Sequence, residues 1–505
     1  TGNTDGWGLT PDNTNGNLDF VRIGGGAGTY FRLAIDGSLS TPTAGTSNVR
    51  FGVNAGNSIA SGGNYNVVVG DEAGTGITTG DNNTFVGYAA GDANTTASFN
   101  TAVGYAAGGA NITGVEMVAV GFEALMSSTA TGQTAVGYRA GRLSTGDDNT
   151  FIGAFAGTAL TTGHSSVAIG FGALDLEDTG RKNVAVGFNA LTTQNADVDN
   201  NNTAVGFHAG RLTSTGIDDT FVGNLAGDNN STGLANVFIG SRAGRFNTQG
   251  DVNTFIGASA GHGVDGSELT GNGNVAVGQG AGQDLQGAAH SNTIVGRDAG
   301  AAVSTGNRST LLGFDCGKTI TTGQLDTYVG MQITASAADV DHEIAIGSLI
   351  SGAGTNTVRI GTTNGFIQIA LNQSTTSWSA GSDERLKKDI QTSTAGLSFI
   401  NDLRPVTYKW NAKNAIANSL PQYDASSSDP IWGGGETIHG FVAQEVKTVL
   451  DAHSEVSDTN GLWSQDPNGT QQIAYGELVP MLTKAVQELS TALDAALARI
   501  ATLEG

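Results

Sequence analysis

Residues 83–91 read NTFVGYAAG, and the same phrase returns as NTAVGYAAG at 100–108 and NTAVGFHAG at 202–210. One glycine in the middle of the phrase marks each copy, and these marker glycines run from Gly52 to Gly361. Eleven of the 18 intervals between successive markers are 17 residues long, and most of the others differ by one or two. A short fixed period of this kind predicts a solenoid, in which each repeat packs only on its neighbours.

The repeat predicts strands rather than helices. It contains two or three glycines and is rich in Thr, Val, Ile, Phe and Asn, which are poor helix formers. Side chains alternate along a strand, so Thr84, Val86 and Tyr88 share one face and Phe85 lies on the other. We expect each chain to bury mostly Ala, Val and Gly, with Thr beside the Val, and to leave columns of Phe and Tyr outside. Such an exposed apolar stripe favours lateral association.

A second glycine usually falls ten residues after the marker, in T-T-G or S-T-G, as at Gly80, Gly163 and Gly216. We interpret it as a turn residue that needs a positive φ. Each repeat then consists of strand, turn, short strand and turn, which is one coil of a β-roll or β-helix. At about 4.8 Å per coil, the repeats would form a rod roughly 85 Å long.

Composition excludes several classes of function. The chain has 505 residues and a formal net charge of −23, and its Lys and Arg are scattered singly. A basic stripe for nucleic acid or for an anionic membrane is therefore missing, and no apolar run of about 20 residues predicts membrane insertion. The single cysteine, Cys316, argues against a disulfide and against zinc. The histidines of the repeats lack metal-ligand spacing, so we expect no metal and no cofactor.

The composition changes near residue 381. Of the 77 glycines, 68 precede residue 382, and the first part has only two lysines, Lys182 and Lys318. We predict three regions: a β-structured connector at 1–47, the solenoid at 48–381 and a different domain at 382–505.

Four motifs follow one another in the last region: SDERLKKDI at 382–390, LRPVTYKW at 403–410, HGFVAQEV at 439–446 and YGELVPMLTKAVQEL at 475–489. In this order and at this spacing they resemble the C-terminal intramolecular chaperone domain of phage endosialidases, tailspikes and tail fibres. The resemblance implies a small α+β domain that trimerises and drives folding of the β-rich fibre before it. In many members of that family the domain cuts itself off with a Ser–Lys dyad.

By this resemblance Ser382 would be the nucleophile, Lys387 the base, and the peptide between Gly381 and Ser382 the scissile bond. A lysine can activate a serine hydroxyl when burial lowers the pKa of its amine. His439 is a rival base, and in the alternative reading Ser382 only caps a helix. At most, the chain would be a peptidase acting on itself, with no external substrate. Three more residues match the motif and are expected to position the dyad: Asp383, Glu384 and Arg385.

Apolar residues recur at steps of three and four from 475 to 504, which predicts a helix with a coiled-coil seam. The alternative is a core helix of one globular domain, but nothing follows it in the sequence to pack against it. We expect three chains to meet at the seam and to align the repetitive rod, whose similar coils make slipped pairings easy. The seam residues are Val479, Leu482, Val486, Leu489, Leu493, Ala496, Ile500 and Leu503.

The rod phrase, for example SVAIGFGAL at 166–174, also resembles the heads of trimeric autotransporter adhesins, which form a β-roll in each of three chains. We therefore expect a mainly β homotrimer: a structural, receptor-binding tail fibre of a phage or phage-like particle, assembled in the host cytoplasm and carried on the virion tail. Its partners would be a host receptor or glycan and an upstream fibre or baseplate protein.

Two other functions stay open. One is a bacterial surface trimeric adhesin with the same chaperone. The other is a polysaccharide depolymerase on the rod, for which Asp218, Asp219 and Asp228 could supply a carboxylate pair, although acidic residues in such repeats are usually solvated turn residues. The longest insertion in the period, 262–274, is either a recognition loop or a neutral one.

Overall fold

The chain forms two compact units, residues 1–381 and 382–505. A computed structural model describes residues 6–11, 18–23, 29–33, 39–40, 44–196, 198–371, 379–380, 384, 387–418, 420, 422–431, 435–456, 461–466 and 469–504.

A small antiparallel sheet lies at the start of the first unit, with its strands paired in sequence order. The strands are β1 (Gly6–Pro11), β2 (Leu18–Ile23), β3 (Thr29–Leu33) and β4 (Leu39–Ser40).

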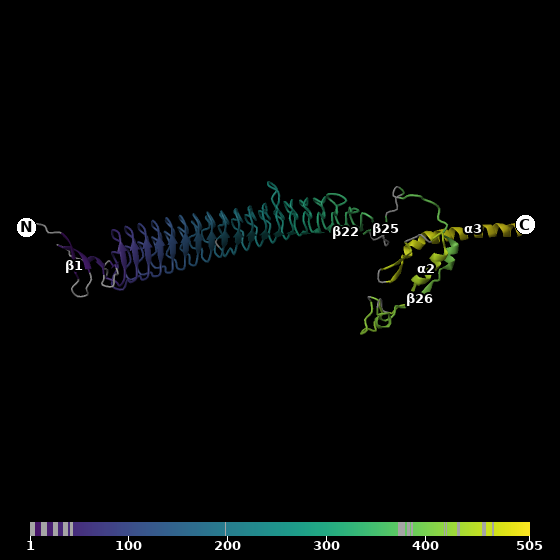
Figure 1. The fold of residues 1–505 in the computed structure, drawn as a ribbon. Helices are drawn as coiled ribbons and strands as arrows, with labels where there is room; N and C mark the ends of the chain where they lie inside the picture. Colours follow the sequence, from purple (N-terminus) through teal and green to yellow (C-terminus); the bar gives the residue numbers. More distant parts are fainter. Residues whose placement is uncertain are drawn as a thin grey trace, which may run out of the picture. The chain divides into compact units, whose positions relative to one another are not determined.

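The remainder of this unit is a β-solenoid of about 18 turns with coils of about 17 residues, which confirms the fold predicted from the repeat (Figure 1). Each three-residue strand pairs in parallel with the strand one coil further on, as Thr84–Val86 does with Thr101–Val103. These strands are β5 (Val49–Phe51), β6 (Val67–Val69), β7 (Thr84–Val86), β8 (Thr101–Val103), β9 (Val118–Val120), β10 (Thr134–Val136), β11 (Thr150–Ile152), β12 (Val167–Ile169), β13 (Val184–Val186), β14 (Thr203–Val205), β15 (Thr220–Val222), β16 (Val237–Ile239), β17 (Thr254–Ile256), β18 (Val275–Val277), β19 (Thr293–Val295) and β20 (Thr310–Leu312).

The last coils have longer strands and then reverse direction. Strands β21 (Thr327–Met331), β22 (Glu343–Ser348) and β23 (Thr357–Thr362) continue the parallel stack. Strand β24 (Gly365–Ala370) turns back antiparallel to β23, and β25 (Ser379–Ala380) pairs antiparallel with β24. The antiparallel strands cover the exposed edge that β23 would otherwise present.

In the coils from β6 to β20 the central residue of the strand points inside and its two neighbours point outside. Phe85 is fully buried, whereas Thr84 and Val86 are half-buried. The prediction that Thr and Val line the inside is therefore wrong, and so is the exposed position expected for Phe at the strand centre. The inside of so small a coil admits one side chain from each strand. The column of Tyr88, by contrast, lies outside as predicted.

Two columns of glycine allow the coils to stack, for different reasons. At the marker Gly87 the φ angle is +134°, and an added Cβ would lie 2.3 Å from the carbonyl oxygen of Gly104. At Gly80 the predicted positive φ is wrong. An added Cβ there would lie 2.4 Å from the carbonyl oxygen of Ala97, so close stacking, not the φ angle, requires this glycine. Left-handed backbone occurs instead at turn residues such as Phe99.

A ladder of buried side-chain amides runs through the coils. The backbone N–H of Asn83 donates to Oδ1 of Asn66 at 3.0 Å, and that of Asn100 donates to Oδ1 of Asn83 at 3.0 Å. The Nδ2 of Asn83 donates to the carbonyl oxygen of Ala97 at 2.9 Å. These bonds satisfy polar groups that have no access to water, so the asparagine of the repeat is a structural residue.

The second unit packs helices and short strands around one small core. Strand pairs β26–β27 and β28–β29 are antiparallel, and the core includes Phe399, Val446, Leu462 and Leu478. None of the helices in the described ranges is long and apolar enough to cross a membrane. The elements are α1 (Leu397–Asp402), β26 (Val406–Tyr408), η2 (Lys413–Ala415), β27 (Ile438–Gly440), α2 (Ala443–Ala452), β28 (Trp463–Gln465), β29 (Gln471–Ile473), η3 (Tyr475–Glu477) and α3 (Leu478–Glu504).

Candidate functional site

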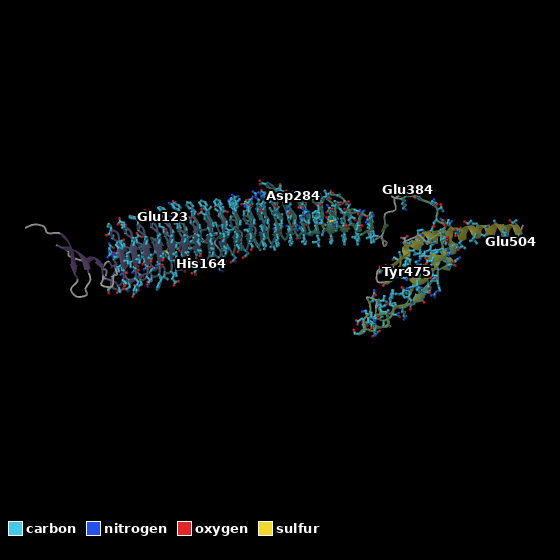
Figure 2. All side chains as sticks on the ribbon, in the orientation of Figure 1. Glu123, His164, Asp284, Glu384, Tyr475 and Glu504 are labelled. Carbon is cyan, nitrogen blue, oxygen red and sulfur yellow. The ribbon has the colours of Figure 1, made fainter. Side chains whose placement is uncertain are left out.

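The structure places only part of the predicted cleavage motif. Glu384 and Lys387 are exposed, and the backbone N–H of Lys387 donates to the carbonyl oxygen of Glu384 at 3.0 Å (Figure 2). The rival base, His439, is exposed on β27 opposite Thr407. The pairing of Ser382 with Lys387 therefore stays a prediction. Four residues of the motif lie outside the described residues: Gly381, Ser382, Asp383 and Arg385.

The other three motifs meet in space. Arg404, in the second motif, pairs with Glu445 in the third, with Nε and Oε2 2.9 Å apart. The backbone N–H of Phe441, in the third motif, donates to the hydroxyl oxygen of Tyr475 in the fourth at 3.2 Å. The motifs thus hold one another in place, although 71 residues separate Arg404 from Tyr475.

An open groove of about 910 Å³ lies where these motifs meet. Aromatic rings from each motif line it, and the rings of Tyr408 and Trp410 are in edge contact at 5.2 Å between centroids. The amides of Gln444 and Gln472 add polar groups to the lining. Tyr475, labelled in Figure 2, is about half exposed at the groove.

A buried histidine that the sequence reasoning missed ties two helices of the second unit together. His453 follows α2, and its side chain is only 9% exposed. Its Nδ1 lies 2.8 Å from the carboxylate of Glu455 and its Nε2 lies 2.8 Å from that of Asp402, at the end of α1. The hydrogen bonds to Glu455 and Asp402 raise the pKa of His453. The positive charge of the imidazolium also interacts favourably with the dipole of α2 at its C-terminal end.

The helix α3 is joined to the core only at its start. Its Glu488 accepts a hydrogen bond from the backbone N–H of Leu397 at 2.8 Å and thereby caps the start of α1. On this side Met481 and Ala485 are buried. Every residue from 489 to 504 is exposed, so the last four turns have no partner within the described part of the chain.

The predicted seam of α3 lies on the uncovered side. The side chains of Val479, Leu482, Val486, Leu489, Leu493, Ile500 and Leu503 are between 45% and 79% exposed. Ala496 is exposed too, and Leu497 adds a further apolar side chain. These apolar side chains are exposed and do not belong to the core of the unit. A core helix would instead bury its apolar side chains.

The rod carries an uncovered apolar face of its own. Exposed rings form a column whose centroids lie 5.0 to 5.6 Å apart from one coil to the next. The Val and Ile that end each strand form a second column beside it, with about 40% exposure at Val136 and Ile152. The ring column consists of Tyr88, Tyr105, Phe122, Tyr138, Phe155, Phe171, Phe188 and Phe207.

The carboxylates considered for a depolymerase do not share a groove. Asp218 is at the surface, where it accepts a hydrogen bond from Asn201 at 3.0 Å. Asp219 is fully buried as a rung of the internal ladder, so its interpretation as a solvated turn residue is wrong. Asp228 is buried beside Arg211, with Nε and Oδ1 2.8 Å apart. A substrate on the surface cannot reach Asp219.

The single cysteine is buried, and two histidines of the repeats, His208 and His262, are half-buried. Cys316 is buried inside the solenoid, and burial raises the pKa of its thiol to about 12. Burial lowers the pKa of His208 and of His262. Across the described ranges, no three His, Cys, Asp or Glu side chains gather in a way that could hold a metal ion.

Comparison with known proteins bears on the second unit. Residues 382–455 match the family model described as chaperone of endosialidase. The match begins at Ser382 and contains the first three motifs, whereas the motif at 475–489 lies beyond it. No curated protein and no solved structure matches the chain. The chain thus combines a β-solenoid rod with a C-terminal domain similar to the endosialidase chaperones.

Proposed function

We propose that this chain is one subunit of a homotrimeric, receptor-binding fibre on the tail of a phage or phage-like particle. The C-terminal unit brings three chains together and folds the rod. The observation that carries this proposal is the uncovered apolar seam of α3. A solitary helix end with a row of exposed leucines is only marginally stable in water, whereas packing three such seams together buries them in a coiled coil.

The rod supports the same assembly. Its Val and Ile column and its ring column run along one chain without a cover, which is unusual for a protein that works as a monomer. In a trimer these faces would pack against the other two chains. The coils would then be stabilised laterally as well as along the rod.

The attachment role rests on the shape of the solenoid unit. A stack of coils is a stiff spacer, and the first part of the insertion at 262–274 forms a loop that stands out from the coils (Figure 1), whereas Leu269 and Asn274 are buried within them. Asp265 and Ser267 are exposed in this loop. We assign receptor or glycan contact to such surfaces of the rod. The connection to an upstream fibre or baseplate protein is assigned to residues 1–47.

The mass of the full chain in solution tests the trimer. Sedimentation equilibrium should give three chains. Leu489→Asp places three carboxylates together in an apolar core at a cost of several kcal/mol, so this variant should give misfolded or aggregated rods. Thr491→Asp, on the outer side of the same heptad, is the matched control and should remain trimeric. A wild-type rod that is soluble as a monomer would contradict the proposal.

A further inference from the structure

Two rungs of the internal ladder are aspartates at positions where the repeat usually has asparagine. The backbone N–H of Asp219 donates to Oδ1 of Asn202 at 2.9 Å, and that of Asn236 donates to Oδ1 of Asp219 at 2.8 Å. Asp326 occupies the same place further along, since the backbone N–H of Glu343 donates to its Oδ1 at 2.8 Å. Both acidic side chains are fully buried.

An asparagine rung does more than accept these bonds, because its Nδ2 also donates. Asn236, for example, donates from Nδ2 to the carbonyl oxygen of Gly250, 14 residues on, at 2.9 Å. The carbonyl group 14 residues after Asp219 is that of Gly233, and the one 14 residues after Asp326 is that of Val340. An ionised carboxylate has no hydrogen to donate, whereas a protonated carboxyl group has one.

At Asp326 the second carboxyl oxygen takes the place that Nδ2 takes at the asparagine rungs. A Cβ added to Gly323 would lie 2.9 Å from Oδ2 of Asp326 and 2.1 Å from the carbonyl oxygen of Val340. The Oδ2 atom is buried and makes no hydrogen bond. At the asparagine rungs Nδ2 donates to the corresponding carbonyl oxygen, so at Asp326 two acceptors would meet there, which is unfavourable unless the carboxyl group carries a proton.

Asp219 occupies the same kind of rung, but here Nδ2 of Asn230 donates both to Oδ2 of Asp219 and to the carbonyl oxygen of Gly233, at 2.9 Å each. A Cβ added to Gly216 would lie 2.8 Å from Oδ2 of Asp219 and 2.5 Å from the carbonyl oxygen of Gly233. For comparison, a Cβ added to Gly250, three residues before Asn253, would lie 2.7 Å from Nδ2 of that asparagine. The Oδ2 of Asp219 therefore occupies the place of a donor.

The charged groups beside the two acids are other acids, not cations. Asp218 is next to Asp219, and Glu343 and Asp341 face Asp326. Burial, reinforced by these neighbours, raises the pKa of Asp219 to about 8 and that of Asp326 to about 7.

The carboxylate of Glu343, which faces Asp326, accepts hydrogen bonds that favour its ionised form. Its Oε2 accepts a hydrogen bond from the hydroxyl of Tyr328 at 2.6 Å, and its Oε1 accepts one from the backbone N–H of Gly354 at 2.6 Å. Burial opposes ionisation of Glu343, but these hydrogen bonds outweigh it and lower its pKa. The proton of the pair therefore resides on Asp326.

We propose that Asp219 and Asp326 enter the ladder as neutral carboxylic acids, each donating its proton to a carbonyl oxygen of the adjacent coil, and that the rod loosens when they ionise. In the unfolded chain these acids ionise near pH 4. At higher pH the folded chain holds more protons, so the folding equilibrium constant falls about tenfold per pH unit for each acid. The stabilisation is complete below about pH 4 and is lost by about pH 7 for Asp326 and pH 8 for Asp219.

The test uses the full chain with Asp219→Asn, Asp326→Asn and both together. Asparagine is the usual rung, so these variants should fold. The midpoint of thermal unfolding should fall from pH 5 to pH 9 in the wild type and should change much less in the double variant. Asp265→Asn, at an exposed acid that faces neither Asp219 nor Asp326, is the matched control and should follow the wild type.

Infrared spectroscopy gives a second readout that does not depend on unfolding. At pH 6 the wild type should show absorption of protonated carboxyl groups that weakens in the double variant. A double variant with the wild-type pH dependence of unfolding, or with unchanged protonated-carboxyl absorption at pH 6, would overturn the proposal.

Discussion

The proposed cleavage depends on two side chains at the junction of the units. Ser382→Ala removes the hydroxyl that would attack the carbonyl of Gly381, and Lys387→Ala removes the base. The wild type should release a fragment of 124 residues that begins with Ser382, whereas both variants should stay intact and still trimerise. Denaturing electrophoresis with N-terminal sequencing of the small band measures this.

The pH and concentration dependence of the cut separate self-cleavage from a contaminating protease. The rate should rise with pH because the attack of a serine hydroxyl needs a general base, and it should not depend on protein concentration. Lys388→Ala changes the adjacent exposed lysine and should cut as the wild type does. Cleavage of Ser382→Ala would show that another residue is the nucleophile.

His453 shows where sequence reasoning stops at this scale. Its partner Asp402 is 51 residues away, and no motif links the two. A histidine between two carboxylates can be recognised only once α1 and α2 are packed together. The Ser–Lys pair, by contrast, was suggested by a resemblance over a short continuous segment.

Among the elements, the coil depends most on its marker glycine. Gly223 has a φ of +138°, and an added Cβ would lie 2.5 Å from the carbonyl oxygen of Gly240. Gly223→Ala should therefore cost more than the 1–2 kcal/mol (roughly) of a left-handed backbone alone, because the coils must also separate. Gly266→Ala is the control, since its φ is +80° but nothing lies within 4 Å of an added Cβ. The midpoint of thermal unfolding should fall clearly more for Gly223→Ala, and equal shifts would contradict the stacking argument.

The repeat predicts the coil well but not which way its faces point. The 17-residue period and the marker glycines are visible in the sequence because every coil must meet the next at the same place. Alternation shows that Thr84 and Val86 share a face, but it does not show which face is inside. That choice follows from the narrow interior, which accepts only the side chain of Phe85. The close stacking of neighbouring coils, and not a turn with positive φ, explains why residue Gly80 is a glycine.

For the whole molecule, the uncovered surfaces of the two units point to a common assembly. The column of Val and Ile extends along the solenoid, the ring column covers the coils from Tyr88 to Phe207, and the seam extends along α3. Similar coils make it easy for three rods to associate out of step, and glycine-rich coils lose much conformational entropy when they order. A coiled coil that aligns three chains first would remove both obstacles. Folding could then spread from the end of the solenoid towards its beginning.

This order of events predicts that the rod cannot refold once the chaperone has been removed. Cleaved wild-type rods and intact Ser382→Ala rods should both be trimeric before denaturation and should differ only in the covalent link to residues 382–505. After unfolding in guanidinium, purification of the rod fragment and dilution, Ser382→Ala should recover trimers. The wild-type fragment should aggregate, because its native state was kinetically trapped. Sedimentation of both samples measures the recovery, and equal refolding of the isolated rod would show that the C-terminal unit is not needed for folding.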